Sequence, residues 1–260
     1  MNHLNVEDIN ASELKIYQQM RDQVFKDDNS FVADSPKVVN TLLESGIKVK
    51  SILATKEYFE EYEELLLGCE VPTLYLATKE QMHSIVGHKI HHNCMMHGVR
   101  PAMTHLDDLG DEIIMLDAIT STENIGSIAR GAAALGVGSY LLPKDAPHPY
   151  SRRALRVSMG HVTKLKYNIY ENIFQTIKTL QAKGYKVFAA EVSPLAIKLQ
   201  KVEIPKKWVI LMGHEGKGLS QEVIDICDAC VEIEMMSDVR SFNVAVAASI
   251  LMYHFKTYKK

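Results

Sequence analysis

Polar side chains gather at three points of this sequence where an apolar run gives way to a turn or to the start of a helix. They are Asn124, Arg130, Glu215, Ser241 and Asn243. Amide, hydroxyl, carboxylate and guanidinium groups can bind and orient a polar ligand through hydrogen bonds and charge. Each residue taken alone could equally be a helix cap or part of a turn. Ligands of α/β sheets bind outside the carboxyl ends of strands, so the three points together form a candidate site.

The elements that must position these residues alternate between strand and helix from residue 112 onward. Apolar runs predict strands, and helical patterns lie between them. The expected strands are 113–116, 140–142, 186–190, 208–212 and 231–234, and the expected helices are 125–135, 152–159, 172–183, 220–227 and 244–258. This alternation predicts a mostly parallel sheet covered on both faces.

The first hundred residues predict a smaller α/β/α unit. Helices are expected at 12–24, 35–44 and 79–86, and strands at 49–54 and 73–77, with an acidic helix that contains residues 57–64 between the two strands. Segment 100–110 is polar and bounded by Pro and Gly, as is typical of a linker. We therefore expect two domains, 1–105 and 106–260.

Composition limits the class of protein. The chain has 260 residues, 47% of them hydrophobic, which is enough for a sizeable core. No apolar run is long enough to cross a membrane, and the N-terminus has no basic segment followed by an apolar one, so we expect neither a membrane span nor a signal peptide. Four cysteines in a chain of this length do not make a disulfide framework. We expect a reduced, cytoplasmic protein.

Positive charge is concentrated between Lys144 and Lys166, although the net charge is -3. This stretch contains three closely spaced arginines, which are Arg152, Arg153 and Arg156. A local basic patch can bind nucleic acid even when the whole chain is slightly acidic. We expect these arginines to contact phosphates, and the alternative is a solvated helix face.

Two other groups of residues could have a chemical role, as a metal site or as a redox motif. The segment 87–98 is rich in histidine, but its spacing lacks the paired ligands of zinc sites. We expect no metal there, and we expect the loop and strand that lead out of the first domain. Cys227 and Cys230 are separated by two residues, as in redox motifs. They lie between a helix and a strand rather than at a helix start, where thiolates are activated, and we expect a structural role.

The three motifs, in this order and spacing, resemble those of the SpoU family of RNA 2'-O-ribose methyltransferases, which is part of the SPOUT class. They are Asn124-Ile-Gly-Ser-Ile-Ala-Arg130, Gly213-His-Glu215-Gly-Lys-Gly218 and Ser241-Phe-Asn243. The resemblance implies an α/β fold with a C-terminal, trefoil-knotted methyltransferase domain and a smaller N-terminal RNA-binding domain. It also implies S-adenosylmethionine as the methyl donor, and a homodimer whose active site is completed across the interface.

The resemblance also implies roles for single residues. Gly213, Ile233 and Phe242 would line the S-adenosylmethionine site, although the family usually has Leu where this chain has Phe242. Arg130 would act at the reacting hydroxyl. A guanidinium is too weak a base to accept a proton, so we expect orientation and charge stabilisation, with a phosphate or water assisting deprotonation.

The remaining motif residues would position the others. Asn124 would place the ribose or Arg130, Glu215 would orient the loops, and Ser241 and Asn243 would fix the loop on the substrate side. The predicted activity is methylation of a ribose 2'-hydroxyl in RNA, with ribosomal RNA favoured over transfer RNA. The alternatives are a non-catalytic, dimeric RNA-binding relative with the same fold and, less in keeping with the basic patch, an α/β protein that binds only small molecules.

Overall fold

The computed structural model describes residues 2–18, 25, 28–236, 238–239 and 241–258. Their contacts divide the chain into two compact units. Unit 1 consists of Met1–Ala102 and His148–Thr163, and unit 2 consists of Met103–Pro147 and Lys164–Lys260. The chain changes unit after Ala102, after Pro147 and after Thr163. The expected domains, 1–105 and 106–260, stay a prediction.

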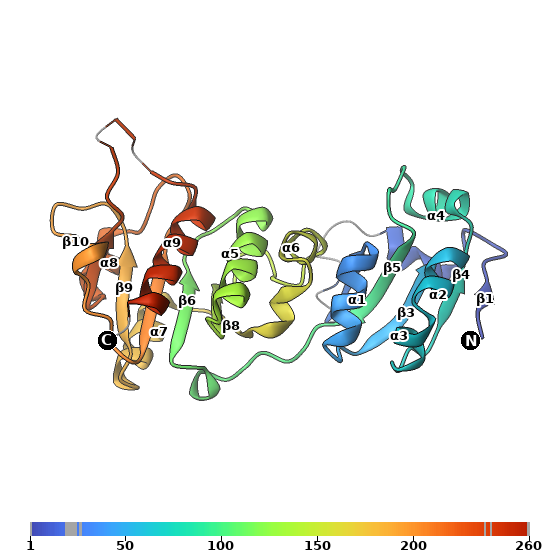
Figure 1. The fold of residues 1–260 in the computed structure, drawn as a ribbon, viewed down its shortest axis with the longest axis horizontal. Coiled ribbons are helices and arrows are strands. Elements are labelled where there is room, and N and C mark those ends of the chain that lie inside the picture. Colours follow the sequence, from blue (N-terminus) through green and yellow to red (C-terminus); the bar gives the residue numbers. More distant parts are fainter. Residues whose placement is uncertain (1, 19–24, 26–27, 237, 240, 259–260) are drawn as a thin grey trace. The chain divides into compact units, whose positions relative to one another are not determined.

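Unit 1 is built on a mixed sheet with the strand order β1-β4-β3-β5-β2 (Figure 1). The three strands β1, β4 and β3 are parallel, and β5 pairs antiparallel with both β3 and β2. Its described strands are β1 (Leu4–Asn5), β2 (Ser30–Asp34), β3 (Val49–Ala54), β4 (Leu74–Leu76) and β5 (Cys94–Val99), and its helices are α1 (Pro36–Glu44), α2 (Lys56–Glu61), α3 (Glu63–Leu67), α4 (Lys79–Val86) and α6 (Arg152–Ser158).

Helix α6 belongs to unit 1, although its sequence lies among the elements of unit 2. Asp34, the last residue of β2, accepts a hydrogen bond from Arg152 of α6. The rings of Phe31 and Tyr150 lie 5.9 Å apart. A side chain at Gly160 would meet Thr41 at 3.1 Å, so glycine permits the chain to approach α1 closely there. These contacts explain why segment 148–163 packs with the N-terminal unit rather than with its neighbours in sequence.

Unit 2 is built on a parallel sheet, which has seven strands among the described residues, in the order β10-β12-β9-β11-β6-β7-β8. Every strand pair in it is parallel. The strands are β6 (Glu112–Leu116), β7 (Ser139–Pro143), β8 (Lys166–Tyr170), β9 (Lys186–Ala190), β10 (Ile197–Lys198), β11 (Trp208–Met212) and β12 (Ala229–Glu232), and the helices are α5 (Thr122–Leu135), α7 (Ile173–Ala182), α8 (Gln221–Ile226) and α9 (Val244–Thr257).

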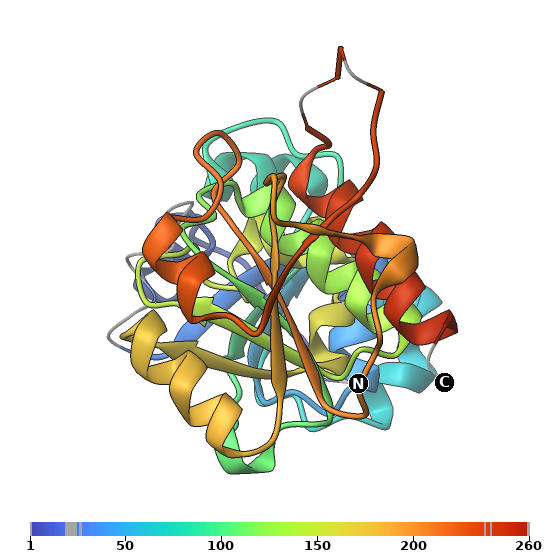
Figure 2. The same cartoon turned by 90° about the vertical axis from the view of Figure 1, so that its left-hand side faces the viewer.

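Helices cover both faces of this sheet (Figures 1 and 2). Helices α7 and α8 lie on one face, where Ile177 and Val223 pack with Ile113 of β6 in one apolar cluster. Helices α5 and α9 lie side by side on the other face, where Phe255 packs edge-on against Trp208. Strands buried on both faces read as continuous apolar runs, as β11 does.

The parallel α/β fold expected from the sequence is confirmed, with strand and helix positions that agree to within a few residues. Strands β8 and β10 of unit 2 and strands β1 and β2 of unit 1 were not expected. The helix expected at 12–24 is a 3-10 helix over Ser12–Gln18, and residues 19–24 lie outside the described part of the chain. The trefoil knot stays a prediction. Among the described residues, no helix has the length and apolar character needed to cross a membrane.

Candidate functional site

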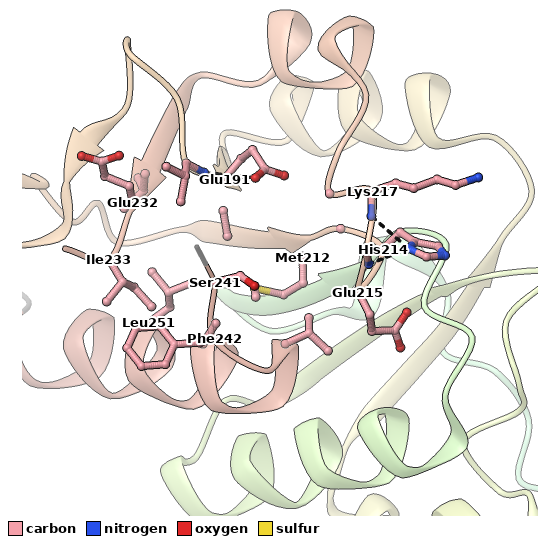
Figure 3. A pocket seen from close by; sticks show the side chains of 18 of the residues that line it. Glu191, Met212, His214, Glu215, Lys217, Glu232, Ile233, Ser241, Phe242 and Leu251 are labelled. Atoms are coloured by element: carbon pink, nitrogen blue, oxygen red, sulfur yellow. Dashed lines mark hydrogen bonds between the residues drawn. The ribbon is translucent and has the colours of Figure 1, made fainter. Parts of the chain in front are cut away.

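A cavity of about 340 Å³ lies at the carboxyl ends of three neighbouring strands of unit 2 (Figure 3). Its walls include Ala190, Met212 and Glu232, the last residues of β9, β11 and β12. The expected cofactor residues Gly213, Ile233 and Phe242 also line it, as do Glu215 and Ser241. Phe242, Ile233 and Leu251 gather at one end, and His214, Glu215 and Lys217 lie at the other.

The glycine-rich turn after β11 forms one wall of this cavity. A side-chain carbon at Gly213 would lie 2.6 Å from the backbone of Gly218 and Leu219, so only glycine fits this close approach of two chain segments. Gly218 has a φ of +66°, in the left-handed region that favours glycine. His214 closes the turn, because its Nδ1 accepts hydrogen bonds from the backbone N–H groups of Gly216 (2.9 Å) and Lys217 (3.2 Å).

Glu191 fastens the same turn to the neighbouring strand. Its Oε2 accepts a hydrogen bond from Leu219 N at 2.9 Å, and its Oε1 accepts one from Val192 N at 3.1 Å. A side chain at Gly218 would collide with this carboxylate. Glu191 was not identified from the sequence. The available signal was its position directly after a strand whose carboxyl end faces the site.

A chain of hydrogen bonds joins the three motifs next to the cavity. Glu215 Oε1 accepts from Asn124 Nδ2 at 3.1 Å, and Asn124 Oδ1 accepts from Asn243 Nδ2 at 3.1 Å. Asn243 Oδ1 in turn accepts from the backbone N–H groups of Ala245 and Val246, which caps α9. The structure is therefore compatible with both roles expected for Asn243, as a helix cap and as a site residue.

The Glu215 carboxylate is held in its charged form. Burial alone would raise its pKa, but the hydrogen bonds that it accepts from Asn124 and from backbone groups outweigh that effect and lower the pKa below its usual range. The backbone donors include Ser121 N, at 3.2 Å, and Thr120 N. Because these donors precede α5, Glu215 connects the turn after β11 to the start of that helix.

We expect this charge to make a pH-dependent contribution to stability. A carboxyl group whose pKa is lower in the folded than in the unfolded protein stabilises the fold at pH values above the unfolded-state pKa, which is about 4.3 for Glu. This stabilisation disappears as the pH falls through the pKa of the folded state. Glu215→Gln should cost about 1 kcal/mol at pH 7, since the group is exposed and its hydrogen bonds compete with water. Urea unfolding of both proteins from pH 7 to pH 3 measures the difference, which should shrink below about pH 4.5. A difference that stays constant with pH would show that the charge is not responsible.

Arg130 lies apart from the hydrogen-bonded chain. It is exposed on α5, six residues after Asn124, which places it about 9 Å further along the helix and about 120° around its axis. Within the described residues it makes no hydrogen bond or ion pair, and it does not line the cavity. The two side chains therefore leave α5 on different sides of the helix.

The three arginines expected to bind RNA lie on α6 in unit 1. Arg152 is already paired, because its Nε lies 2.7 Å and its Nη2 2.5 Å from Asp34 Oδ2, and its side chain is only 16% exposed. Arg156 is 40% exposed and lies near Asp34 Oδ1 at 3.6 Å. Lys144, at the start of the same basic stretch, belongs to unit 2 and pairs with Glu171. The basic stretch is thus partly neutralised by internal ion pairs that the sequence did not reveal.

A structural role was expected for Cys227 and Cys230, and no metal was expected at the histidine-rich segment. Burial raises the pKa of the Cys227 thiol to about 12, and burial also raises that of Cys230, which disfavours the reactive thiolate. Across the described part of the chain, no group of three or more His, Cys, Asp or Glu side chains is arranged to hold a metal ion.

Comparisons with known proteins connect this site to a family. Residues 111–253 match the model of the SpoU rRNA Methylase family. The chain is 28% identical over 228 residues to an uncharacterized tRNA/rRNA methyltransferase of Mycobacterium bovis, which covers 85% of this chain and 79% of that protein.

Two solved structures share the fold over nearly the whole chain. One is the AdoMet-bound rRNA methyltransferase of Sinorhizobium meliloti, with a TM-score of 0.85, 21% identity and 97% of each chain covered. The other is the SpoU methyltransferase AviRb of Streptomyces viridochromogenes in complex with AdoMet, with a TM-score of 0.83, 20% identity, and 95% of this chain and 98% of that one covered. The family model matches more than half of this chain, and hydrogen bonds join the three motifs beside one cavity. This chain therefore belongs to the SpoU rRNA methylase family.

Proposed function

We propose that this protein transfers a methyl group from S-adenosylmethionine to a ribose 2'-hydroxyl of RNA, and that ribosomal RNA is favoured over transfer RNA. The observation that carries the proposal is the junction of Asn124, Glu215 and Asn243 beside a cavity at the strand ends. Membership of an rRNA methylase family and the names of its relatives support an RNA substrate. A cytoplasmic location is part of the proposal, because ribosomal and transfer RNA act there.

The cavity fits the proposed methyl donor. Ile233, Phe242 and Leu251 offer an apolar wall for an adenine ring, and the backbone at Gly213 is open to close approach. Glu232 can accept hydrogen bonds from hydroxyl or ammonium groups. When bound, S-adenosylmethionine supplies an electrophilic methyl group on a sulfonium centre. The protein's part is to hold that centre next to the ribose and to exclude competing water.

The motif residues would orient and stabilise the reacting hydroxyl. Arg130 would bind the hydroxyl and the neighbouring phosphate, and would stabilise the alkoxide that develops as the proton leaves. Asn124 is fixed on both sides, by Glu215 and by Asn243, so its position is set before the substrate binds. A phosphate oxygen or a water molecule would accept the proton, because the guanidinium keeps its own.

We also propose that the protein acts as a homodimer. Arg130 leaves α5 on a different side from Asn124 and does not line the cavity of its own chain, so a second copy could bring one chain's arginine to the other chain's cavity. Helix α9 presents an apolar face to solvent, on which Val246 is 48% and Tyr253 is 57% exposed, seven residues apart. Such a face next to the site is suited to an interface.

The proposal predicts both cofactor binding and self-association by the full chain. Isothermal titration with S-adenosylmethionine should show one site per chain, and sedimentation of the same sample should give twice the chain mass of 29.2 kDa. Ribose-methylation mapping of RNA from cells with and without the gene would then identify the modified nucleotide. A protein that binds RNA and the cofactor without transferring a methyl group would be the non-catalytic relative, and a monomer without affinity for the cofactor would contradict the proposal as a whole.

A further inference from the structure

A second cavity lies in unit 1, at the carboxyl end of β2. It has a volume of about 220 Å³ and is formed by Asp34, by the loop after α4 and by two arginines of α6. The loop residues that line it are His88, Lys89, Ile90, His91 and His92. Ligand pockets for drug-sized molecules are usually about 300–1,000 Å³, so this cavity suits a smaller group such as one nucleobase.

The wall of this cavity contains a buried carboxylate, and only one of its two oxygens accepts a hydrogen bond. Asp34 is 3% exposed, its Oδ2 accepts a hydrogen bond from Arg152 Nε, and Arg152 Nη2 forms an ion pair with the same oxygen. Its Oδ1 makes no hydrogen bond, and Arg156 Nε lies 3.6 Å from it. A buried acceptor without a donor is costly, and such an atom in a cavity wall is matched by a ligand that donates a hydrogen bond.

The rest of the wall favours an anionic ligand and is held in place. Arg156 Nη2 donates to His92 Nε2 at 2.7 Å, and Lys79 Nζ donates to the backbone oxygen of His92. Burial lowers the pKa of His92, and the nearby positive charge of Arg156 lowers it further, although the Asp34 carboxylate acts in the opposite direction. A lowered pKa favours the neutral ring, which can accept the hydrogen bond from Arg156. Lys89 is exposed at the mouth, where no hydrogen bond or ion pair with a described residue holds its ammonium group.

We propose that this cavity binds one nucleotide of the RNA substrate, with an exocyclic amino group of the base donating to Asp34 Oδ1 and the phosphate held by Lys89 and Arg156. Cytidine is the simplest ligand that satisfies both requirements, because carboxylates accept hydrogen bonds from its N4 amino group. Ile90 and Met95, both buried, provide apolar contact for the base. The inference rests on the proposed RNA substrate, and it places one recognition point in unit 1.

Nucleotide binding can be measured on the ¹⁵N-labelled full chain. Cytidine and uridine 5'-monophosphate have the same shape, but position 4 carries a donor in cytidine and an acceptor in uridine. Both are titrated to millimolar concentration while the amide signals of His88, Lys89 and Met95 are followed. Cytidine monophosphate should bind about tenfold more tightly than uridine monophosphate. Equal affinities, or equal shifts with inorganic phosphate alone, would overturn the proposal.

Asp34→Asn should reverse this preference. Arg152 presents donors, so the amide oxygen of the new side chain should turn toward Arg152 and its NH₂ group should face the cavity. The cavity would then offer a donor, which matches O4 of uridine. Lys89→Ala should weaken both nucleotides about threefold, as expected for an exposed charge. Lys48→Ala, at the other end of β5 near Val99, is the matched control and should change nothing.

These outcomes separate the cavity from the catalytic proposal. If Asp34→Asn does not fold, the affinities of the two nucleotides for the wild type and for Lys89→Ala still test the proposed nucleotide site. Methyl transfer to total RNA is measured on the same wild-type preparation. An active enzyme without a cytidine preference overturns only the nucleotide site, and an inactive protein with that preference overturns only the methyl transfer.

Discussion

Arg130→Ala is expected to lower methyl transfer by about 10²–10³-fold while S-adenosylmethionine still binds with its normal affinity. Removing one group that stabilises developing negative charge typically costs a rate factor of this size. Cofactor affinity should survive because Arg130 does not line the cavity of unit 2. Stability should also survive, since the side chain is exposed and makes no hydrogen bond or ion pair with the described residues. Single-turnover methylation, titration of the cofactor and thermal unfolding measure the three effects separately.

Two further variants distinguish the planar guanidinium from simple charge. Arg130→Lys keeps the charge but loses the two parallel donors, and it should remain impaired. Lys178→Ala removes an exposed positive charge from α7, on the opposite face of the sheet, and should be fully active. Activity of Arg130→Ala within a fewfold of the wild type would remove this residue from the catalytic site and would leave its place in the motif without a chemical role.

The fold of unit 2 could be predicted because its strands are buried on both faces. β11 and β6 consist almost entirely of apolar residues, so length and flanking turns were sufficient to locate them. β8 was missed because its sequence, Lys166-Tyr-Asn-Ile-Tyr170, mixes polar and apolar residues at the end of a basic stretch. β8 is held in the sheet by its pairing with β7, a tertiary contact that the local sequence pattern does not indicate.

The candidate site could likewise be predicted only in part from the sequence. Glu215 and Asn243 could be selected because each stands in a motif after a recognisable strand, and the structure brings both to Asn124. The ion pair of Asp34 with Arg152 joins residues 118 positions apart, and nothing in either local sequence indicates it. A run of arginines indicates positive charge, but only the fold decides how much of that charge is already neutralised within the protein.

The second large effect is expected at Gly213. Gly213→Ala would place a side-chain carbon 2.6 Å from backbone atoms of Gly218 and Leu219, a distance that those atoms cannot accommodate without moving. Overpacking of this kind costs about 1–3 kcal/mol. The segment that must yield is the turn lining the cavity, which Glu191 and His214 hold in one conformation. We therefore expect cofactor affinity to fall by about 5- to 150-fold, the factor that corresponds to this energy.

Gly216→Ala in the same turn provides the matched control. A side-chain carbon there would have its nearest contact at 3.8 Å, on the His214 ring, and the backbone of Gly216 is not in the left-handed region. Both variants add one methyl group to the same turn, so they differ only in the space available. Isothermal titration should show near-normal cofactor binding for Gly216→Ala and weak binding for Gly213→Ala. Equal affinities would mean that the turn can rearrange freely around the ligand, and that the close approach at Gly213 serves the fold rather than the cavity.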